Sequence, residues 1–425
     1  MPVDYGEERD LFSSSSQKKV QTEIPQNPVG KLLKSLISRV YWILFFGPWT
    51  WMFRAASWLV PKQANLFIFG SNEGKHFSDN SRSLFEYIQS NDDSIRAVWF
   101  TNNKEVYKKI DEEYPGSVVM SPSFKSAYIY LRAKEAIISY GYQDLCKMPW
   151  IPSIKVNQFW HGVPIKKIGL LRNSTKTKSD YGPTWPIFIK WIDKVDRFFV
   201  ASDYERRVYI QAFSLPEDRF VLSGNPRNDL LYETSAKKES PGNVILYAPT
   251  FRSRHHDGQN DNGVLIHPNI DETTMHNFLV RNNARLIVRP HWIDGKRTFN
   301  SDRIECVTHD EEPNLNRIFV NSDILITDYS SAFIDWLILD RPLIFVPYDL
   351  ESYEEKNGFL DDYEALVPQP IRLDAEEALI EIEKAIVDRN RYRNDRSKAM
   401  IRYLQDGKYG ICERVMYVLK NNRDE

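Results

Sequence analysis

Residues 323–339 read DILITDYSSAFIDWLIL, and they place an apolar strand, a polar turn and a helix in immediate succession. Ile324–Thr327 is short and apolar without alternation, which is typical of a strand that helices bury on both faces. Ser330 and Ser331 are residue types that cap helices, so we expect a helix over Ala332–Leu339. A strand, a turn and a helix form the repeating unit of α/β folds with parallel sheets.

The same unit recurs on both sides of this stretch. Short apolar runs predict strands at Asn65–Phe69, Ile95–Thr101, Ser117–Met120, Ala136–Tyr140, Ile154–Trp160, Phe198–Ala201, Phe220–Ser223, Val244–Ala248, Leu286–Arg289, Ile304–Val307 and Leu343–Val346. Further helices are predicted at Ser81–Ser90, Asp203–Phe213, Thr273–Asn282 and Ala375–Val387. The strands fall into two groups, so the sequence predicts two Rossmann-like α/β domains that face a cleft.

Composition marks the boundaries of these parts. We expect a disordered leader over residues 1–30, an amphipathic membrane-associating segment over 31–62, a first domain over 63–232, a linker over 233–243, a second domain over 244–388, and C-terminal helices over 389–425 that pack back on the first domain. The leader is polar and has no apolar h-region, which argues against a cleaved signal peptide. The linker is rich in Lys, Ser, Pro and Gly.

Charge, cysteine content and motifs exclude several functions. The 425 residues carry 56 basic and 58 acidic side chains, so no global positive field points to nucleic acid. The three cysteines form no CxxC pair, which argues against a disulfide framework or a zinc knuckle. There is no GxGxxG and no GxxxxGK[ST], and a dehydrogenase or P-loop interpretation therefore has no support.

The segment Lys31–Lys62 differs from the rest of the chain. It carries five basic residues and no acidic one, and its centre is rich in tryptophan and phenylalanine. Pro48 interrupts the apolar run, which is shorter than the roughly 20 residues that a spanning helix needs. Aromatic and basic residues favour the headgroup layer, so we expect the segment to lie on an anionic membrane surface. A buried or dimer-forming helix pair is the alternative.

Five polar segments follow predicted strands: WHGVPIKK (160–167), GNPRND (224–229), YAPTFR (247–252), VRPH (288–291) and DILITDYSS (323–331). Ligands of open parallel sheets bind at the carboxyl ends of the strands. These segments are therefore the candidates for the functional site.

His161 is the candidate general base. Histidine is the side chain best suited to accept a proton near neutral pH, and Gly162 permits a tight turn and close approach of a ligand. Lys166 and Lys167 follow closely and are suited to bind phosphates. A structural histidine is the alternative that the residue type alone favours.

The second group of strands offers an anion site. Arg289 and His291 flank Pro290 and carry donors suited to a pyrophosphate, and Arg252 adds a cation from a neighbouring strand. Ser330 and Ser331 lie where the helix begins, a position that favours anions. The alternatives are a carboxylate partner for Arg289, a capping role for His291, and capping alone for the serines. Together, the groups favour a site for a phosphorylated nucleotide.

The sequence assigns no metal site and no cofactor. Asp257 and Asp261 share a polar insertion, residues 253–269, with His255 and His256, but without DxD or HxxxH spacing. A divalent cation thus has only weak support, and a mobile solvated loop is expected.

Taken together and in this order, WHGVPIKKIG, GNPRNDLL, YAPTFR, RPH, DILITDYSSAFIDW and RPLIFVPYDLESY resemble the CDP-glycerol:poly(glycerophosphate) glycerophosphotransferase family of teichoic-acid polymerases and primases. The resemblance runs from Gln158 to Tyr353. It implies a GT-B fold, peripheral attachment to the cytoplasmic face of the cell membrane, and a CDP-glycerol or CDP-ribitol donor. It also implies transfer of the alditol phosphate to a lipid-linked or polymeric acceptor, with release of CMP, in teichoic-acid or capsule-type synthesis.

The resemblance also implies roles for individual residues. His161 would be the base that deprotonates the acceptor hydroxyl. Arg289, His291, Ser330 and Ser331 would hold the donor pyrophosphate, with Thr250 and Arg252 near the donor. We count His291 with His161 as catalytic, and we also expect substrate-binding roles for Gly162, Lys166, Lys167, Arg227 and Asp328. The chain departs from the family at His291-Trp292, where members often have His-Pro or His-Tyr.

Two other functions remain open on sequence alone. A GT-B glycosyltransferase would use the same anion site for a nucleotide sugar in cell-surface polysaccharide synthesis. A membrane-surface scaffold would bind nucleotide without turnover. The choice between glycerol and ribitol, the number of units added and the oligomeric state are likewise open.

Overall fold

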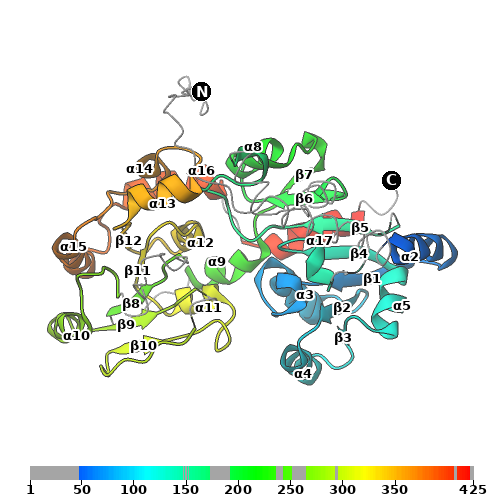
Figure 1. The fold of residues 1–425 in the computed structure, drawn as a ribbon, viewed down its shortest axis with the longest axis horizontal. Coiled ribbons are helices and arrows are strands. Elements are labelled where there is room, and N and C mark those ends of the chain that lie inside the picture. The colour runs from blue at the N-terminus through cyan, green and yellow to red at the C-terminus, as the bar shows by residue number, and fades with distance from the viewer. Residues whose placement is uncertain are drawn as a thin grey trace, which may run out of the picture.

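The computed structural model describes residues 47–146, 148, 151, 153–172, 192–235, 243–250, 265–291, 295–405 and 409–421. Within these ranges the chain forms two sheets with strand orders β3-β2-β1-β4-β5-β6-β7 and β10-β9-β8-β11-β12. All pairings between these strands are parallel. Figure 1 shows the two sheets as separate units with helices around each. The predicted α/β class with two parallel sheets is confirmed.

The strands lie where the apolar runs predicted them. Their bounds are β1 Gln63–Phe69, β2 Arg96–Thr101, β3 Val118–Met120, β4 Ala133–Ile138, β5 Lys155–Gln158, β6 Arg197–Val200, β7 Phe220–Leu222, β8 Asn243–Tyr247, β9 Ala284–Val288, β10 Ile304–Cys306, β11 Ile324–Thr327 and β12 Leu343–Phe345. β4 begins before the predicted Ala136. The strand includes Glu135, a buried carboxylate that an apolar pattern does not predict. Asn157 Nδ2 and Arg197 Nη1 donate to Glu135 at 2.8 and 3.3 Å, which satisfies its charge inside the sheet.

Helices connect the strands. Their bounds are α2 Gly47–Leu59, α3 Asp79–Asn91, α4 Lys104–Glu113, α5 Phe124–Arg132, α8 Asp203–Phe213, α9 Asp229–Ser235, α10 Glu272–Arg281, α11 Leu315–Val320, α12 Ala332–Trp336, α13 Leu350–Asn357, α14 Tyr363–Leu366, α15 Ala375–Val387, α16 Arg393–Leu404 and α17 Ile411–Asn421. α8 and α15 have the predicted bounds. α3 begins at Asp79 rather than at the predicted Ser81, and the first of these two added residues lines the cavity described below.

Buried apolar side chains cover both faces of each sheet. On the first sheet, Phe67 and Phe69 of β1 pack in one cluster with Val415 and Leu419, so the C-terminal helix α17 lies against this sheet. On the second sheet, Ile326 of β11 belongs to a cluster with residues of α10 and α15. Burial on both faces explains why the strand sequences are apolar without alternation.

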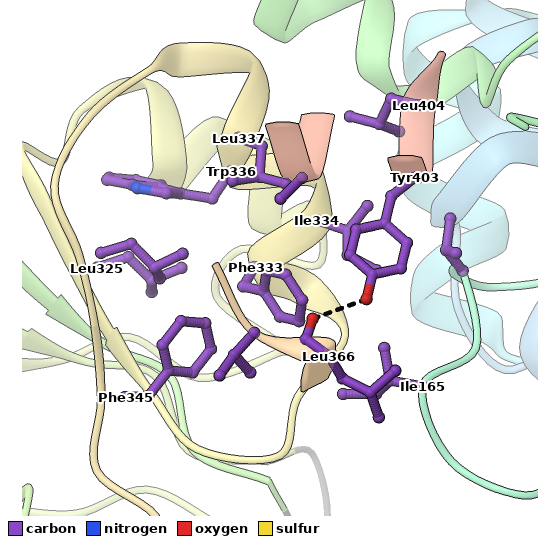
Figure 2. Close-up of a cluster of buried hydrophobic side chains, with 14 of the residues drawn as sticks. Ile165, Leu325, Phe333, Ile334, Trp336, Leu337, Phe345, Leu366, Tyr403 and Leu404 are labelled. Atoms are coloured by element: carbon purple, nitrogen blue, oxygen red, sulfur yellow. Dashed lines mark hydrogen bonds between the residues drawn. The ribbon is translucent and has the colours of Figure 1, made fainter. Parts of the chain in front are cut away.

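One further core cluster joins the two units (Figure 2). Ile165, from the segment after β5 in the first unit, belongs to the same cluster as Phe333 of α12 and Phe345 of β12 in the second unit. Tyr403 of α16 lies in the same cluster and its hydroxyl donates to the Leu366 carbonyl at 2.7 Å. The chain that follows His161 is therefore held against the second unit by buried apolar surface, which fixes the walls of the space between the sheets.

Several predicted segments lie outside the described residues: the leader, most of the linker, Arg252, and His255, His256, Asp257 and Asp261 of the insertion. Of the membrane-associating segment, the structure describes the part that forms α2. Among the helices described, none is both long and apolar enough to span a bilayer.

Candidate active site

A cavity of about 460 Å³ lies between the two sheets. It collects most of the residues predicted from the sequence: His161, Gly162, Lys166, Arg227, Thr250, Arg289, His291, Ser330 and Ser331. All of them follow the carboxyl ends of parallel strands, as the position of ligand sites in such sheets predicts. Lys167 is exposed beside Gly358 and does not line the cavity.

His161 lies just beyond β5 on the cavity wall. Its ring stacks on Tyr140, with centroids 4.5 Å apart and planes 6° apart, and on Trp160 at 4.8 Å. The ring is exposed to the cavity. Desolvation by the surrounding protein lowers the pKa of His161 to about 4, and the carboxylate of Asp79 opposes this shift. His161 is therefore neutral near pH 7 and able to accept a proton.

Gly162 brings the two units into close approach. Its φ of +145° is a conformation that residues with a side chain rarely adopt. A Cβ at this position would lie 3.2 Å from Ser331 Oγ and 3.4 Å from Arg227 Nη2. The Tyr209 hydroxyl donates to the Gly162 carbonyl at 3.0 Å and so anchors the turn from α8.

Gly162→Ala is expected to lower turnover by on the order of 100-fold, because a small displacement of a reacting group has effects of that size. The reason is that the added methyl group would push Ser331 and Arg227 away from His161. The CMP release that the resemblance implies, measured at equal thermal stability, tests this. Gly116→Ala is the matched control, since Gly116 also has a positive φ, +79°, but open space around it. Equal losses of turnover in the Gly162 and Gly116 variants would contradict the role of Gly162 in positioning Ser331 and Arg227.

Arg227 joins the two units through a buried ion-pair network. Its Nη1 donates to Asp79 Oδ1 at 2.6 Å, and its Nη2 and Nε donate to Asp335 Oδ2 at 2.8 and 2.9 Å. Burial works against this charge, but Asp335 and Asp79 together raise the pKa of Arg227 above its usual range. With its guanidinium engaged in this way, Arg227 holds α3 and α12 in place beside the cavity.

Amide side chains extend this network. Asn228 Nδ2 donates to Asp335 Oδ1 at 2.9 Å, and Asn316 Nδ2 donates to the Arg227 carbonyl at 2.8 Å. Asn80 connects Arg227 to the segment that carries His161. The Asn80 Oδ1 accepts from the Arg227 amide at 3.2 Å, and the Asn80 Nδ2 donates to the Trp160 carbonyl at 3.1 Å. The backbone next to His161 is thus tied to the interdomain ion pairs.

The second unit contributes hydroxyl groups. Thr250 follows β8, and both its amide and its hydroxyl donate to Asp328 Oδ1, at 2.8 and 2.7 Å. Asp328 is buried behind Thr250, and the structure places it as the support of Thr250 rather than on the cavity wall. Ser330 Oγ accepts from the Ala332 amide at 3.3 Å, whereas Ser331 makes no side-chain capping bond and faces Gly162.

Two basic side chains, Arg289 and Lys166, also line the cavity. Arg289 is buried and its Nη1 donates to the carbonyls of Val307, at 3.2 Å, and Thr308. Lys166 reaches across from the first unit, where its Nζ donates to the Tyr353 hydroxyl at 2.8 Å. Burial, with the charge of Lys166, lowers the pKa of His291 to about 4.

Sequence reasoning missed Tyr140, Asp79, Asn80 and Asp335. Asp79 and Asn80 begin a helix directly after the loop that follows β1, which is the same post-strand position as that of the predicted residues. Their position after a strand could have identified both Asp79 and Asn80 as candidates. Asp335 lies within α12, and only the tertiary fold reveals its partner. The Tyr140 hydroxyl hydrogen-bonds Asp79, so the ring behind His161 belongs to the same network.

The arrangement separates two chemical functions within one cavity. A neutral histidine stands on the wall of the first sheet, and hydroxyl and basic groups stand on the other side. Such a site can remove a proton from one substrate while it stabilises negative charge on phosphates of another.

Comparison with known proteins identifies relatives of the chain. The chain is 29% identical to the teichoic acid poly(glycerol phosphate) polymerase of Bacillus spizizenii, over 83% of this chain and 89% of that protein. It is also 29% identical to the teichoic acid glycerol-phosphate transferase of Staphylococcus aureus, over 83% of this chain and 92% of that protein. A structure of the wall teichoic acid polymerase TagF soaked with CDPG superimposes with a TM-score of 0.72 at 21% identity, covering 94% of this chain and 99% of that one.

The family model described as CDP-glycerol:poly(glycerophosphate) glycerophosphotransferase matches residues 52–419. This range contains both sheets and every described residue of the cavity wall. The chain therefore belongs to the CDP-glycerol:poly(glycerophosphate) glycerophosphotransferase family.

Proposed function

We propose that this transferase moves glycerol phosphate, or a related alditol phosphate such as ribitol phosphate, from a CDP-alditol to an acceptor hydroxyl in teichoic-acid-type synthesis, with release of CMP. The observation that carries the proposal is that His161, Lys166, Arg289 and Ser331 line one cavity. Family membership supports the reaction class, and the relative soaked with CDPG supports a CDP-linked donor.

The first step takes place at His161. Its neutral ring accepts the proton of the acceptor hydroxyl as the oxygen attacks the β-phosphorus of the donor. The bond between that phosphorus and the bridging oxygen breaks, and CMP leaves with the electron pair. Tyr140 and Trp160 hold the ring plane between them, so the base keeps its orientation.

The donor side of the cavity stabilises the charge that develops. The Arg289 guanidinium and the Lys166 ammonium supply positive charge, while the Ser331 hydroxyl supplies a donor. Phosphoryl transfer depends mainly on position and charge stabilisation, both of which rigid groups in a buried site provide. Asp328 keeps the Thr250 hydroxyl oriented.

Donor binding tests the proposal directly. We expect CDP-glycerol or CDP-ribitol to raise the melting temperature of the chain more than UDP- and GDP-sugars do at equal concentration. Mixing with a lipid-linked acceptor should then release CMP. Stronger stabilisation by a UDP-sugar, with transfer of the sugar, would instead identify a glycosyltransferase.

Attachment to the membrane surface is proposed for one end of the first unit. α2 lies beside α5 there (Figure 1), and both helices expose large apolar side chains. Trp58, Leu59 and Phe124 are 82%, 84% and 97% exposed. Exposed aromatic and aliphatic groups next to Lys125 and Arg54 fit the headgroup layer of an anionic bilayer.

Replacing Trp58, Leu59 and Phe124 together by serine is expected to weaken binding to anionic vesicles by about 100-fold, since partial burial of each side chain contributes roughly 1 kcal/mol. Vesicle sedimentation with the full chain measures this. Val387→Ser combined with Ile401→Ser is the control, because those side chains are 87% and 65% exposed on other helices. Unchanged partitioning of the triple variant would refute attachment through this surface.

A further inference from the structure

We propose that His76, His309 and Asp310 form a site for a divalent metal ion of borderline softness, such as Zn²⁺, that links the two units beside the cavity. His76 belongs to the first unit and precedes α3, while His309 and Asp310 follow β10 in the second. One ligand atom from each residue lies within 4.8 Å of the others. The large separation in sequence explains why motif spacing gave no indication of this cluster.

The residue types suit such an ion. Imidazole nitrogens and a carboxylate oxygen are common zinc ligands, and two histidines favour zinc over magnesium or calcium. The two rings meet edge to face, with centroids 4.5 Å apart and planes at 75°, rather than stacking. Three protein ligands leave the fourth tetrahedral position open. Because His309 also lines the cavity, this position has access to a ligand bound there.

The loop that carries His309 and Asp310 is held in place. Arg289 Nη1 donates to the Val307 and Thr308 carbonyls, so the loop starts from a fixed point. The Glu311 carboxylate accepts from the Thr308 amide at 2.8 Å and from its hydroxyl at 2.9 Å. A rigid loop lowers the entropy lost when ligands converge on an ion.

The first-unit ligand is supported as well. His76 follows Lys75, whose carbonyl accepts from Asn103 Nδ2 at 3.1 Å, and precedes Phe77, which is buried in the core. The two halves of the cluster therefore approach each other on separate rigid supports.

The histidines are in a state that can bind metal. His309 Nδ1 is buried and has no hydrogen-bond partner in the described part of the chain, a state that is unfavourable for a polar atom. Lys75 and Arg289 face the pair as cations, and Asp310 and Asp79 as anions.

Since the ligands come from both units, the ion binds best when the units are apposed as they are here. Metal binding should thus shift the population toward this arrangement and stabilise the chain. The expectation concerns metal affinity and stability, and it holds whether or not the donor is a CDP-alditol.

Calorimetric titration of the full chain with Zn²⁺, without a polyhistidine tag and after chelator treatment, tests the proposal. We expect one site whose affinity falls at least about 100-fold in His76→Ala and in His309→Ala, because even partners outside the ligand shell change affinity by 10- to 100-fold. Zn²⁺ should raise the melting temperature of the parent chain and leave that of both variants unchanged.

Two controls make the outcome decisive. His276→Ala removes a half-buried histidine that is bonded to Ser301, and it should bind Zn²⁺ like the parent. Replacing both His255 and His256 by alanine should also keep the site. Equal melting temperatures in chelator would establish that the His76 and His309 variants fold. Absence of Zn²⁺ binding, undiminished binding in both variants, or loss of binding only in the His255 and His256 variant would overturn the proposal.

Discussion

His161→Ala is expected to lower the rate of CMP release by about 1,000-fold, a typical contribution of a general base. The variant removes the neutral ring that stacks on Tyr140 and lines the cavity. The ring nitrogens can take the proton at pH 7, and alanine removes them. Steady-state assays with a CDP-alditol and a lipid-linked acceptor measure the effect.

The expected loss should appear in kcat, with donor binding nearly unchanged. His276→Ala is the control and should retain parental turnover, because His276 bonds Ser301 and does not line the cavity. If His161→Ala kept more than about a tenth of the parental rate at equal melting temperature, another group would have to be the base.

The proposed role of His161 also predicts that kcat/KM falls at acidic pH. The pKa of His161 is lowered to about 4, so kcat/KM should stay level down to about pH 5 and fall below it. The unfolded chain binds this proton more tightly, so protonation also favours unfolding as the pH falls from 6.5 toward 4. Circular dichroism at each pH separates the two effects.

Arg227→Ala is expected to destabilise the chain by about 3 to 5 kcal/mol, since it leaves buried carboxylates without their partner. Asp79 and Asp335 come from different units, and both depend on this guanidinium. Turnover should fall with stability, because Asn80 ties the same network to the backbone of Trp160. Chemical denaturation monitored by fluorescence measures the change.

A surface ion pair gives the comparison. Arg281→Ala breaks a 2.6 Å pair with Glu383 whose arginine side chain is 68% exposed, and it should cost less than about 1 kcal/mol. In the Arg227→Met background, Asp79→Asn combined with Asp335→Asn should restore part of the stability by removing the unpaired charges. Similar small effects for Arg281→Ala and Arg227→Ala would mean that the network contributes little.

The fold was predictable where burial alone determines the sequence. Ile324–Thr327 is apolar because helices cover both faces of its sheet, and such runs identify a strand without help from the tertiary structure. The early start of β4 was not predictable, since Glu135 is tolerated there only through Asn157 and Arg197 of neighbouring strands.

The part of the site that lies at strand ends was predictable. His161, Arg289 and Ser331 follow strand ends, and parallel topology alone brings such positions to one edge. The partners of Arg227 depend instead on how the two units dock, which no local pattern encodes. The pairing of His76 with His309 depends on the same docking.

The most direct test of the proposed reaction is the mass of the acceptor after incubation with purified chain. A lipid-linked acceptor with CDP-glycerol or CDP-ribitol should gain whole alditol-phosphate units, with one CMP released per unit and no gain from UDP-sugars. CMP release without any gain in acceptor mass, or addition of a sugar, would contradict alditol-phosphate transfer in this cavity.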